Sequence, residues 1–237
     1  MAAGIAHELN QPLTGVRGLA ELTLIEQDQN WELSREELRE RLGQIIEQAD
    51  RMVHIIDRVR TFARGAGNPE TSLVQVNDVV RSGIELLGVQ FSTRKLELKM
   101  ELAEDLPLVR ANPYSLEEVV INLLSNARDA TEAHRDEEGA ARRPGVLIRT
   151  GSNGVDNDSR VQIQIIDSGV GIPADIVPKV FDPFFTTKGP KKGTGLGLAI
   201  SLSIVEQFGG DLQVESMPGT GTTMTISLPV AQEPHGD

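Results

Sequence analysis

The stretch AHELNQPL, at residues 6–13, decides how the rest of this chain is interpreted. It places a histidine beside an acid and five residues before a proline, among apolar residues that recur every three to four positions. That spacing predicts an amphipathic helix, on which His7 lies about 200° around from Leu9 and points away from the buried stripe. Pro12 removes one backbone hydrogen bond and loosens the turn that holds His7. Such a histidine is usually an ordinary surface residue, so its meaning depends on motifs further along.

The composition limits the kinds of partner that the chain can have. Its 237 residues suffice for one large or two modest domains, and its net charge is −12. That charge disfavours nucleic acid and anionic membranes, so a polyanion such as ATP would need local donors and a metal ion. The absence of cysteine excludes thiol catalysis and fits a reducing compartment. No apolar run reaches the roughly 18 residues of a membrane helix, and no signal peptide opens the chain, so we expect no membrane segment.

The first part of the chain has the pattern of two long helices. The first runs to about Gln27, and residues 28–30 break it. Ser34, with Glu37 three residues later, forms a capping box that predicts the start of the second helix. The apolar positions of the second helix alternate steps of four and three, which is typical of a coiled-coil seam. They are Leu38, Leu42, Ile45, Ala49, Met52, Ile56, Val59 and Ala63.

Two helices alone cannot bury so long a seam, whereas two copies of the pair form a four-helix bundle. We therefore predict a homodimer through residues 1–64. The alternative is a hairpin that packs within one chain against a second domain. Residues 65–69, GAGNP, predict a short hinge after the second helix.

Beyond the hinge the pattern changes to mixed strands and helices, which predicts an α/β domain. We expect strands at residues 73–76, 96–102, 146–150, 161–166, 211–215 and 222–228. We expect helices at residues 77–87, 115–130 and 196–208, with Asn77 as the cap of the first. Residues 131–145 are expected to form a polar loop.

The helix expected after Pro113 carries a polar strip beside its apolar face. Glu118, Asn122 and Asn126 are each four residues apart and so line up along this strip. Asparagine is a mediocre helix former, and two on one strip suggest a function. Their carbonyl oxygens could ligate Mg²⁺ or bind phosphate-linked water. Solvated asparagines without such a role are the alternative.

Two glycine-containing segments follow. Asp167 ends a strand and precedes Gly169 and Gly171, so its carboxylate would be fixed beside open backbone and could accept a hydrogen bond from an exocyclic amine such as that of adenine. A tight turn without a ligand is the alternative. Residues 193–198, GTGLGL, open a predicted helix, where free N–H groups and the helix dipole favour phosphate. This pattern is neither a Walker A loop nor part of a Rossmann order.

In their order, these segments resemble the sensor histidine kinases of bacterial two-component systems, in the form found in oxygen- and dicarboxylate-sensing members. The boxes that carry the resemblance are the phosphoacceptor box at residues 7–13, the N box at 122–127, the G1 box at 167–171, the F box at 181–185 and the G2 box at 193–198. The resemblance covers nearly the full chain. It implies a multi-domain α and α+β fold, in which a long helical hairpin forms a dimeric four-helix bundle and precedes an α/β-sandwich ATP-binding domain.

On this basis we expect four parts. They are a dimerisation and phosphotransfer domain at residues 1–64, a hinge at 65–72, a catalytic ATP-binding domain at 73–232 and a tail at 233–237. The family's first helix starts upstream of the phosphoacceptor box. We therefore expect the chain to be the cytoplasmic core of a bacterial sensor whose upstream sensor region is absent.

The resemblance implies an ATP-dependent, autophosphorylating protein-histidine kinase that passes its phosphoryl group to the aspartate of a response-regulator receiver domain. His7 would be the phosphoacceptor and Glu8 its general base. An imidazole attacks only through an unprotonated nitrogen, which a neighbouring carboxylate can select. Gln11 stands where many family members have Thr or Asn that supports dephosphorylation of the partner, and it is the candidate for that role.

The resemblance also implies ATP and Mg²⁺ as cofactors. Asn126 would ligate Mg²⁺, Asp167 would bind the adenine amine, and Lys188 with the G2 backbone would hold the phosphates under a lid of residues 186–195. The other nucleotide-binding positions would be Asn122, Gly169, Gly171, Gly193, Thr194, Gly195, Leu196, Gly197 and Thr222. Closure of the lid and rotation about residues 65–72 would bring the γ-phosphate to the histidine.

Two other functions are compatible with the pattern. An ATP hydrolase of the same fold would use an acid to activate water, but the corresponding position holds Asn122, a poor base. A regulatory scaffold would bind nucleotide only to change shape, and it would not need both the histidine–acid pair and the nucleotide-binding residues.

Overall fold

The computed structural model describes residues 2–29, 34–64, 70–138, 145–154, 159–188 and 195–231. Within these ranges, side-chain positions are described for all residues except 2–8, 54, 57–64 and 135–138. No helix among the described residues is both long enough and apolar enough to cross a membrane.

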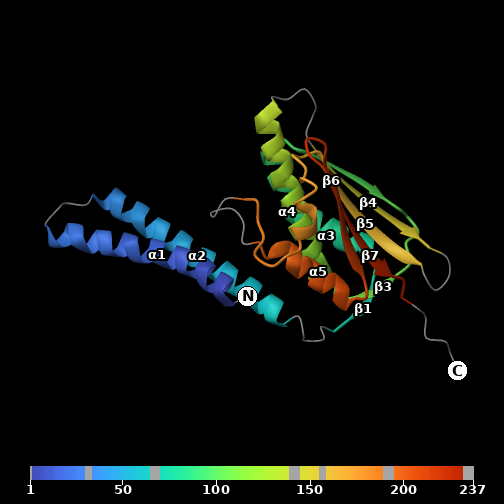
Figure 1. Cartoon of the computed structure of the whole chain (residues 1–237), viewed down its shortest axis with the longest axis horizontal. Helices are drawn as coiled ribbons and strands as arrows, with labels where there is room; N and C mark the ends of the chain where they lie inside the picture. The colour runs from blue at the N-terminus through green and yellow to red at the C-terminus, as the bar shows by residue number, and fades with distance from the viewer. Residues whose placement is uncertain are drawn as a thin grey trace.

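Two long helices, α1 (Ala2–Asp28) and α2 (Arg35–Arg64), form an antiparallel hairpin that extends away from the rest of the chain (Figure 1). The predicted capping box is present at the start of α2. Its Ser34 Oγ accepts the backbone N–H of Glu37 at 3.1 Å, and the Glu37 carboxylate accepts the Ser34 N–H at 2.9 Å. An ion pair between Arg41 and Glu26 joins the two helices near their connection, with Nη2 2.9 Å from Oε1.

Only part of the predicted seam of α2 is covered within one chain. Leu38, Ile45 and Met52 are half-buried, whereas Leu42 and Ile56 are exposed. Among the residues of α2 whose side chains the structure describes, Ile55 is the most buried, with 2% of its surface exposed, and Ile56 beside it is 51% exposed. The intrachain contact therefore lies one position away from part of the predicted seam, which leaves a second apolar stripe of α2 uncovered.

The remaining elements form the part called here the sheet domain, from β1 to β7. Its main sheet has the strand order β2-β4-β5-β7-β6. These strands are β2 (Glu97–Leu102), β4 (Gly145–Asn153), β5 (Arg160–Asp167), β7 (Gly221–Pro229) and β6 (Asp211–Met217). β2 and β4 are parallel, and the other neighbours are antiparallel. A small antiparallel pair, β1 (Ser72–Val74) and β3 (Val109–Ala111), lies at the foot of the domain (Figure 1).

Three helices cover one face of the main sheet: α3 (Val76–Thr93), α4 (Pro113–Glu138) and α5 (Gly197–Gln207) (Figure 1). A short 3₁₀ helix, η2 (Val177–Lys179), lies in the connection from β5 to α5. β5 alternates fully buried with half-buried residues, as expected of a strand that has one face against the helices. The buried apolar residues that α4 contributes to the core are Leu116, Val119, Val120, Leu123, Leu124 and Ala127.

Two helices were predicted too short. α4 continues to Glu138, so the polar loop expected at residues 131–145 is wrong over 131–138. The buried Thr131 satisfies its hydroxyl on the carbonyl of Ala127 at 2.7 Å, which keeps a polar residue inside the helix. α3 continues to Thr93 because Phe91, 1% exposed, anchors its last turn in the core.

The predicted cap of α3 was also wrong. Gln75 is the N-cap residue, and its side chain accepts the N–H of Asn77. Asn77 is instead buried, where its Nδ2 donates to the carbonyl of Ala103 at 2.7 Å and its Oδ1 accepts the hydroxyl of Thr150 at 2.8 Å. Asn77 therefore joins the start of α3 to the ends of β2 and β4. Strand β3 was not predicted, because a three-residue strand has too few positions for a periodic pattern.

Candidate functional site

The carboxylate of Asp167 lies at the end of β5, directly opposite Thr222 of β7 in the antiparallel register. Its Oδ1 accepts the backbone N–H of Gly169 at 2.8 Å and that of Thr222 at 3.2 Å. Burial raises the pKa of Asp167 to about 6, although these two hydrogen bonds favour the charged form. The structure therefore brings together the two residues that were expected near an adenine base.

Backbone packs closely around this carboxylate. A Cβ atom at Gly169 would lie 2.7 Å from Asp167 Oδ1, and one at Gly221 would lie 1.9 Å from the carbonyl oxygen of Asp167. Gly171 has φ +71°, and a Cβ there would meet the carbonyl of Met217 at 2.1 Å. Only glycine fits these positions, so the turn after β5 is fixed against the turn between β6 and β7.

Asn126 and Lys188, which were expected to bind Mg²⁺ and phosphate respectively, contact one another directly. Lys188 Nζ donates to Asn126 Oδ1 at 3.1 Å and to Asp129 Oδ2 at 2.8 Å. These contacts join the polar strip of α4 to the segment that follows the F box. An amide oxygen and a carboxylate oxygen therefore already surround one cation in this region.

Asn122 has a different environment from Asn126. Its Nδ2 donates to the hydroxyl of Ser201 at 2.9 Å, and Ser201 is buried in α5. A Cβ atom at Gly197 would lie 2.5 Å from Asn122 Oδ1. Asn122 therefore fixes the first turns of α5 against α4, and the bare backbone of Gly197 makes this approach possible.

Asp129 is a residue that the sequence analysis missed. Its Oδ1 accepts two hydrogen bonds from Arg128, from Nε at 3.0 Å and from Nη2 at 2.6 Å. Burial raises the pKa of Asp129, but the hydrogen bonds from Lys188 and Arg128 outweigh burial and hold that pKa below its usual value. The spacing of three residues from Asn126 places Asp129 on the same side of α4, and this spacing was a signal available in the sequence.

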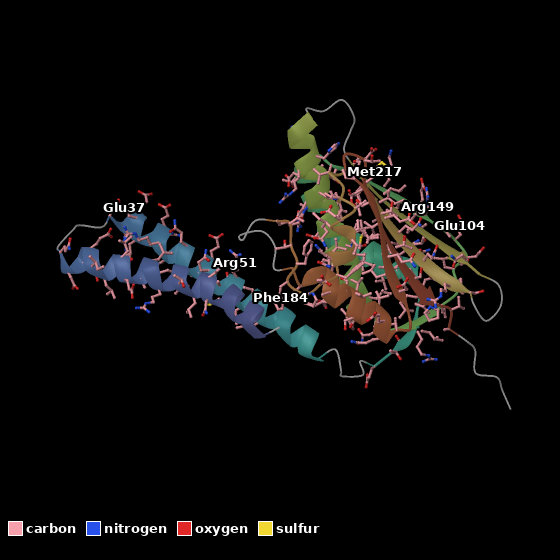
Figure 2. All side chains as sticks on the ribbon, in the orientation of Figure 1. Glu37, Arg51, Glu104, Arg149, Phe184 and Met217 are labelled. Atoms are coloured by element: carbon pink, nitrogen blue, oxygen red, sulfur yellow. The ribbon has the colours of Figure 1, made fainter. Side chains whose placement is uncertain are left out.

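The two ends of the predicted lid at residues 186–195 are held together by the backbone. The Phe184 N–H donates to the carbonyl of Gly195 at 2.9 Å. Phe184 has φ +70°, which is unfavourable for a residue with a side chain, and its contacts with the core hold it there. Figure 2 shows Phe184 on the side of the sheet domain that faces the hairpin, whereas Glu104 and Arg149 lie on the opposite side.

The first turn of α5 presents backbone N–H groups without a side-chain cap. Leu196 is the N-cap residue, is 1% exposed and makes no side-chain cap hydrogen bond. The N–H groups of the first turn and the positive end of the helix dipole suit an anion such as phosphate. Leu196 and Gly197 can serve such a ligand only through their backbone. Gly193 and Thr194, which were expected to contribute too, lie outside the described residues.

The phosphoacceptor box occupies the start of the hairpin. His7 and Glu8 lie within α1, and their side chains are outside the described set. Gln11 is exposed, whereas Pro12 is buried. Because the hairpin is antiparallel, the start of α1 lies beside the last turns of α2, at the end of the hairpin nearest the sheet domain (Figure 1). α2 contacts α5, so the phosphoacceptor turn and the helix that follows the G2 box both lie where the hairpin meets the sheet domain.

We expect Gly195→Ala to destabilise the sheet domain by roughly 2–4 kcal/mol. A Cβ atom at residue 195 would lie 2.3 Å from the carbonyl carbon of Phe184, and Gly195 has φ +63°, which is unfavourable for alanine. Urea unfolding followed by circular dichroism would measure the change. Gly88→Ala is the matched control, because its Cβ would enter open space on helix α3 and should stabilise slightly. Equal unfolding midpoints for Gly195→Ala and wild type would contradict the close backbone contact between Phe184 and Gly195, called here the backbone clamp.

Comparison with known proteins identifies both parts of the chain. Residues 111–232 match the family described as histidine kinase-, DNA gyrase B- and HSP90-like ATPase. Residues 1–68 match the His Kinase A (phospho-acceptor) domain. The two matches fall on separate parts of the chain, in agreement with its division into a hairpin and a sheet domain.

Among curated proteins, the chain is 33% identical over 231 residues to the sensor histidine kinase ZraS of Escherichia coli strain K12, an alignment that covers 97% of this chain and 45% of ZraS. It is 34% identical over 230 residues to the C4-dicarboxylate transport sensor protein DctB of Rhizobium meliloti, covering 96% of this chain and 34% of DctB. The chain thus spans less than half the length of these relatives.

Solved structures show the same architecture. Full-length ShkA in complex with AMPPNP has a TM-score of 0.68 and 26% identity, over 98% of this chain and 46% of that one. Histidine kinase ThkA in complex with the response regulator protein TrrA has a TM-score of 0.71 and 22% identity, over 98% of this chain and 61% of that one. By its two domains and its relatives, the chain belongs to the sensor histidine kinases of two-component systems.

Proposed function

We propose that this chain is the kinase core of a two-component sensor: it binds ATP, phosphorylates itself on His7 and passes the phosphoryl group to a response-regulator aspartate. The observation that carries the proposal is the convergence of one set of groups in the sheet domain. A buried carboxylate suits an adenine amine, Lys188 and the uncapped start of α5 suit phosphates, and the Asn126 oxygen suits the accompanying cation. Membership of the ATPase family and the likeness to ShkA, solved with AMPPNP, support nucleotide binding.

Adenine recognition depends on Asp167. Two backbone N–H groups hold Oδ1 of the carboxylate, so the direction of its second oxygen, Oδ2, is fixed. An exocyclic amine can donate a hydrogen bond to Oδ2, whereas a ligand carbonyl in the same place would be repelled. Thr222, whose hydroxyl lies 2.8 Å from that of Ser216, forms the adjoining wall.

The donor set near Asn126 fits a divalent cation. The Asn126 oxygen already accepts a hydrogen bond from an ammonium group, so it faces a position suited to positive charge. No three His, Cys, Asp or Glu side chains among the described residues gather into a metal-binding cluster. A Mg²⁺ ion would therefore depend largely on nucleotide phosphates, which is its usual mode in phosphoryl-transfer sites. When bound, Mg²⁺ would neutralise charge on the transferring phosphate.

Phosphoryl transfer requires mainly positioning and electrostatic stabilisation. In the proposal, His7 presents an unprotonated ring nitrogen to the γ-phosphate, and Glu8 holds or accepts the proton of the other nitrogen. Lys188 and the first N–H groups of α5 bind the phosphates, and the lid of residues 186–195 excludes water. Rotation about the hinge at residues 65–72 brings the phosphate to the histidine. Asn112 anchors the end of this hinge, because its Nδ2 donates to the carbonyl of Glu70 at 3.0 Å.

The hairpin supports the proposal of a homodimer. The uncovered stripe of α2 repeats in alternating steps of four and three, the spacing of a helix-packing seam. Its members are the exposed Leu42, Ile46, Val53 and Ile56, with the half-buried Ala49 between them. α1 adds exposed leucines and an isoleucine, which are Leu13, Leu22, Leu24 and Ile25. A second hairpin would cover both stripes and complete a four-helix bundle over residues 1–64.

The receiver domain of a response regulator is the proposed recipient of the phosphoryl group, in line with the ThkA complex with TrrA. Gln11 lies one helical turn after His7 and is exposed, so it can reach a bound receiver. Simple ATP hydrolysis is disfavoured, because the position that would hold a water-activating acid is Asn122, whose amide is held by Ser201. The proposal also includes a cytoplasmic location and three domain limits: a hinge at residues 65–72, the catalytic ATP-binding domain at 73–232 and a tail at 233–237.

The kinase proposal predicts a phosphohistidine. Wild-type protein incubated with Mg²⁺ and γ-labelled ATP should acquire acid-labile, alkali-stable label, and His7→Ala should acquire none while it still binds ADP. His134→Ala is the matched control and should keep the label. Label that persists in His7→Ala would refute the assignment, as would a wild-type chain that binds ATP and stays unlabelled even after extension upstream.

The raised pKa of Asp167 predicts that ATP affinity depends on pH. The carboxylate is ionised above about pH 6 and becomes protonated as the pH falls through that value, which weakens its hydrogen bond to an amine. The affinity ratio of wild type to Asp167→Asn should therefore fall by up to about tenfold between pH 7.5 and pH 5. Titration of the ATP phosphates affects both proteins equally and cancels in this ratio. A ratio that stays constant would exclude Asp167 from adenine binding.

The dimer proposal predicts that charge on the uncovered stripe separates the subunits. Wild type should sediment as a dimer at micromolar concentration, and the double variant Ile46→Glu/Ile56→Glu should sediment as a monomer, because each subunit would bury two charges in the interface. Leu86→Glu, an exposed position on α3, serves as the control and should remain dimeric. A monomeric wild type would show that the stripe has another partner.

A further inference from the structure

Two oxygens of α4 converge on one ammonium group. Asp129 Oδ2 lies 2.8 Å from Lys188 Nζ, and Asn126 Oδ1 lies 3.1 Å from the same atom. The two acceptors belong to residues three apart on one helix, whereas the lysine reaches them from the segment after the F box. The cation is therefore supplied by a part of the chain that is separate from the part that binds it.

The carboxylate of Asp129 is oriented independently of Lys188. Arg128 binds its Oδ1 through two nitrogens, and Arg128 is itself held by Ser125 at 3.1 Å and by Gln90 of α3. The Arg128 side chain is only 11% exposed, so this support is well shielded. Because Oδ1 is occupied in this way, Oδ2 keeps its direction when the lysine leaves.

An amide oxygen and a carboxylate oxygen are ligands typical of Mg²⁺, which takes one or two carboxylates together with water and phosphate oxygens. Asn126 is a neutral ligand, so by itself it would not balance any of the charge of the cation. The carboxylate of Asp129 adds one negative charge beside it. Arg128 pairs with Oδ1 of this carboxylate, so Oδ2 is the oxygen that faces the second cation.

We propose that Asp129 and Asn126 together form the protein's half of the divalent-cation site, and that the Lys188 ammonium occupies this site until magnesium and nucleotide enter. Lys188 then moves to the phosphates. The inference rests on the proposed function, because it needs a nucleotide that binds in this domain. It assigns Asp129 a direct role at the cation, and it explains why Lys188, three residues after the F box, contacts Asn126 of the N box.

The test compares the affinity for AMPPNP with Mg²⁺ and with EDTA, by calorimetry on the whole chain. In Asp129→Asn, the gain in affinity due to Mg²⁺ should fall by at least about tenfold, while the affinity in EDTA stays equal to that of wild type or rises because Lys188 is released. Lys188→Met should show the opposite pattern, with weaker binding in EDTA and a preserved gain from Mg²⁺. The ratio within one variant does not depend on the folded fraction.

Glu132→Gln is the matched control. It removes the same charge one turn further along α4, where the carboxylate pairs with Arg94, and it should leave the gain from Mg²⁺ unchanged. The inference is overturned if Asp129→Asn weakens binding equally with Mg²⁺ and with EDTA, as expected of a residue that only positions Lys188. Wild-type chain that binds no AMPPNP under either condition would overturn the proposed function, and this assignment with it.

Discussion

Burial of the apolar face of α4 sets the geometry on which the rest of the sheet domain depends. That face packs against the main sheet, and α3 and α5 pack on either side of the helix. A helix held on three sides cannot rotate about its axis, so the polar strip that contains Asn126 and Asp129 has a fixed direction. Asn122, on the border of that strip, uses the same constraint to place the first turn of α5. One packed helix thus aligns both the cation-binding oxygens and the phosphate-binding backbone.

The electrostatic design suits a chain with a large negative net charge. Positive potential for a polyanion is provided locally, by Lys188, by Arg128 and by the start of α5. The acids near the site are managed in two different ways. Asp129 is held charged by two cations, whereas burial makes ionisation of Asp167 more costly, although two backbone N–H groups favour its charged form. Each environment fits a different ligand, a cation in one case and a neutral amine in the other.

Local patterns predicted most elements of this fold, because helices and strands impose periods of 3.6 and 2 on buried positions. The capping box at Ser34 was predicted correctly, and so was the open backbone beside Asp167, where Gly169 and Gly171 pack closely. The extension of α4 was missed because its last turns are mainly polar and resemble a loop. The burial of Ile55 in place of Ile56 depends on which face of α2 meets α1, and one helix's pattern cannot determine that.

Contacts between distant segments were harder to predict. The pairing of Asp167 with Thr222 depends on the β5–β7 register, which was available only through the resemblance to the kinase family. Asp129 follows an arginine and looks like half of an ordinary surface ion pair in the sequence. Its meaning becomes visible only when Lys188, which is distant along the chain, is placed beside it.

The hydrogen bond between Phe184 and Gly195 has a consequence for how this family of sites can diversify. It closes the lid segment into a loop whose two ends are fixed by the core, independently of what lies between them. The entropic cost of closing such a loop grows only with the logarithm of its length, by about 0.6 kcal/mol for each doubling. Insertions and deletions between the two ends can therefore accumulate in evolution while the start of α5 keeps its place. The contact between Phe184 and Gly195 thus keeps the start of α5 in place, while the length of the segment between these two residues can change.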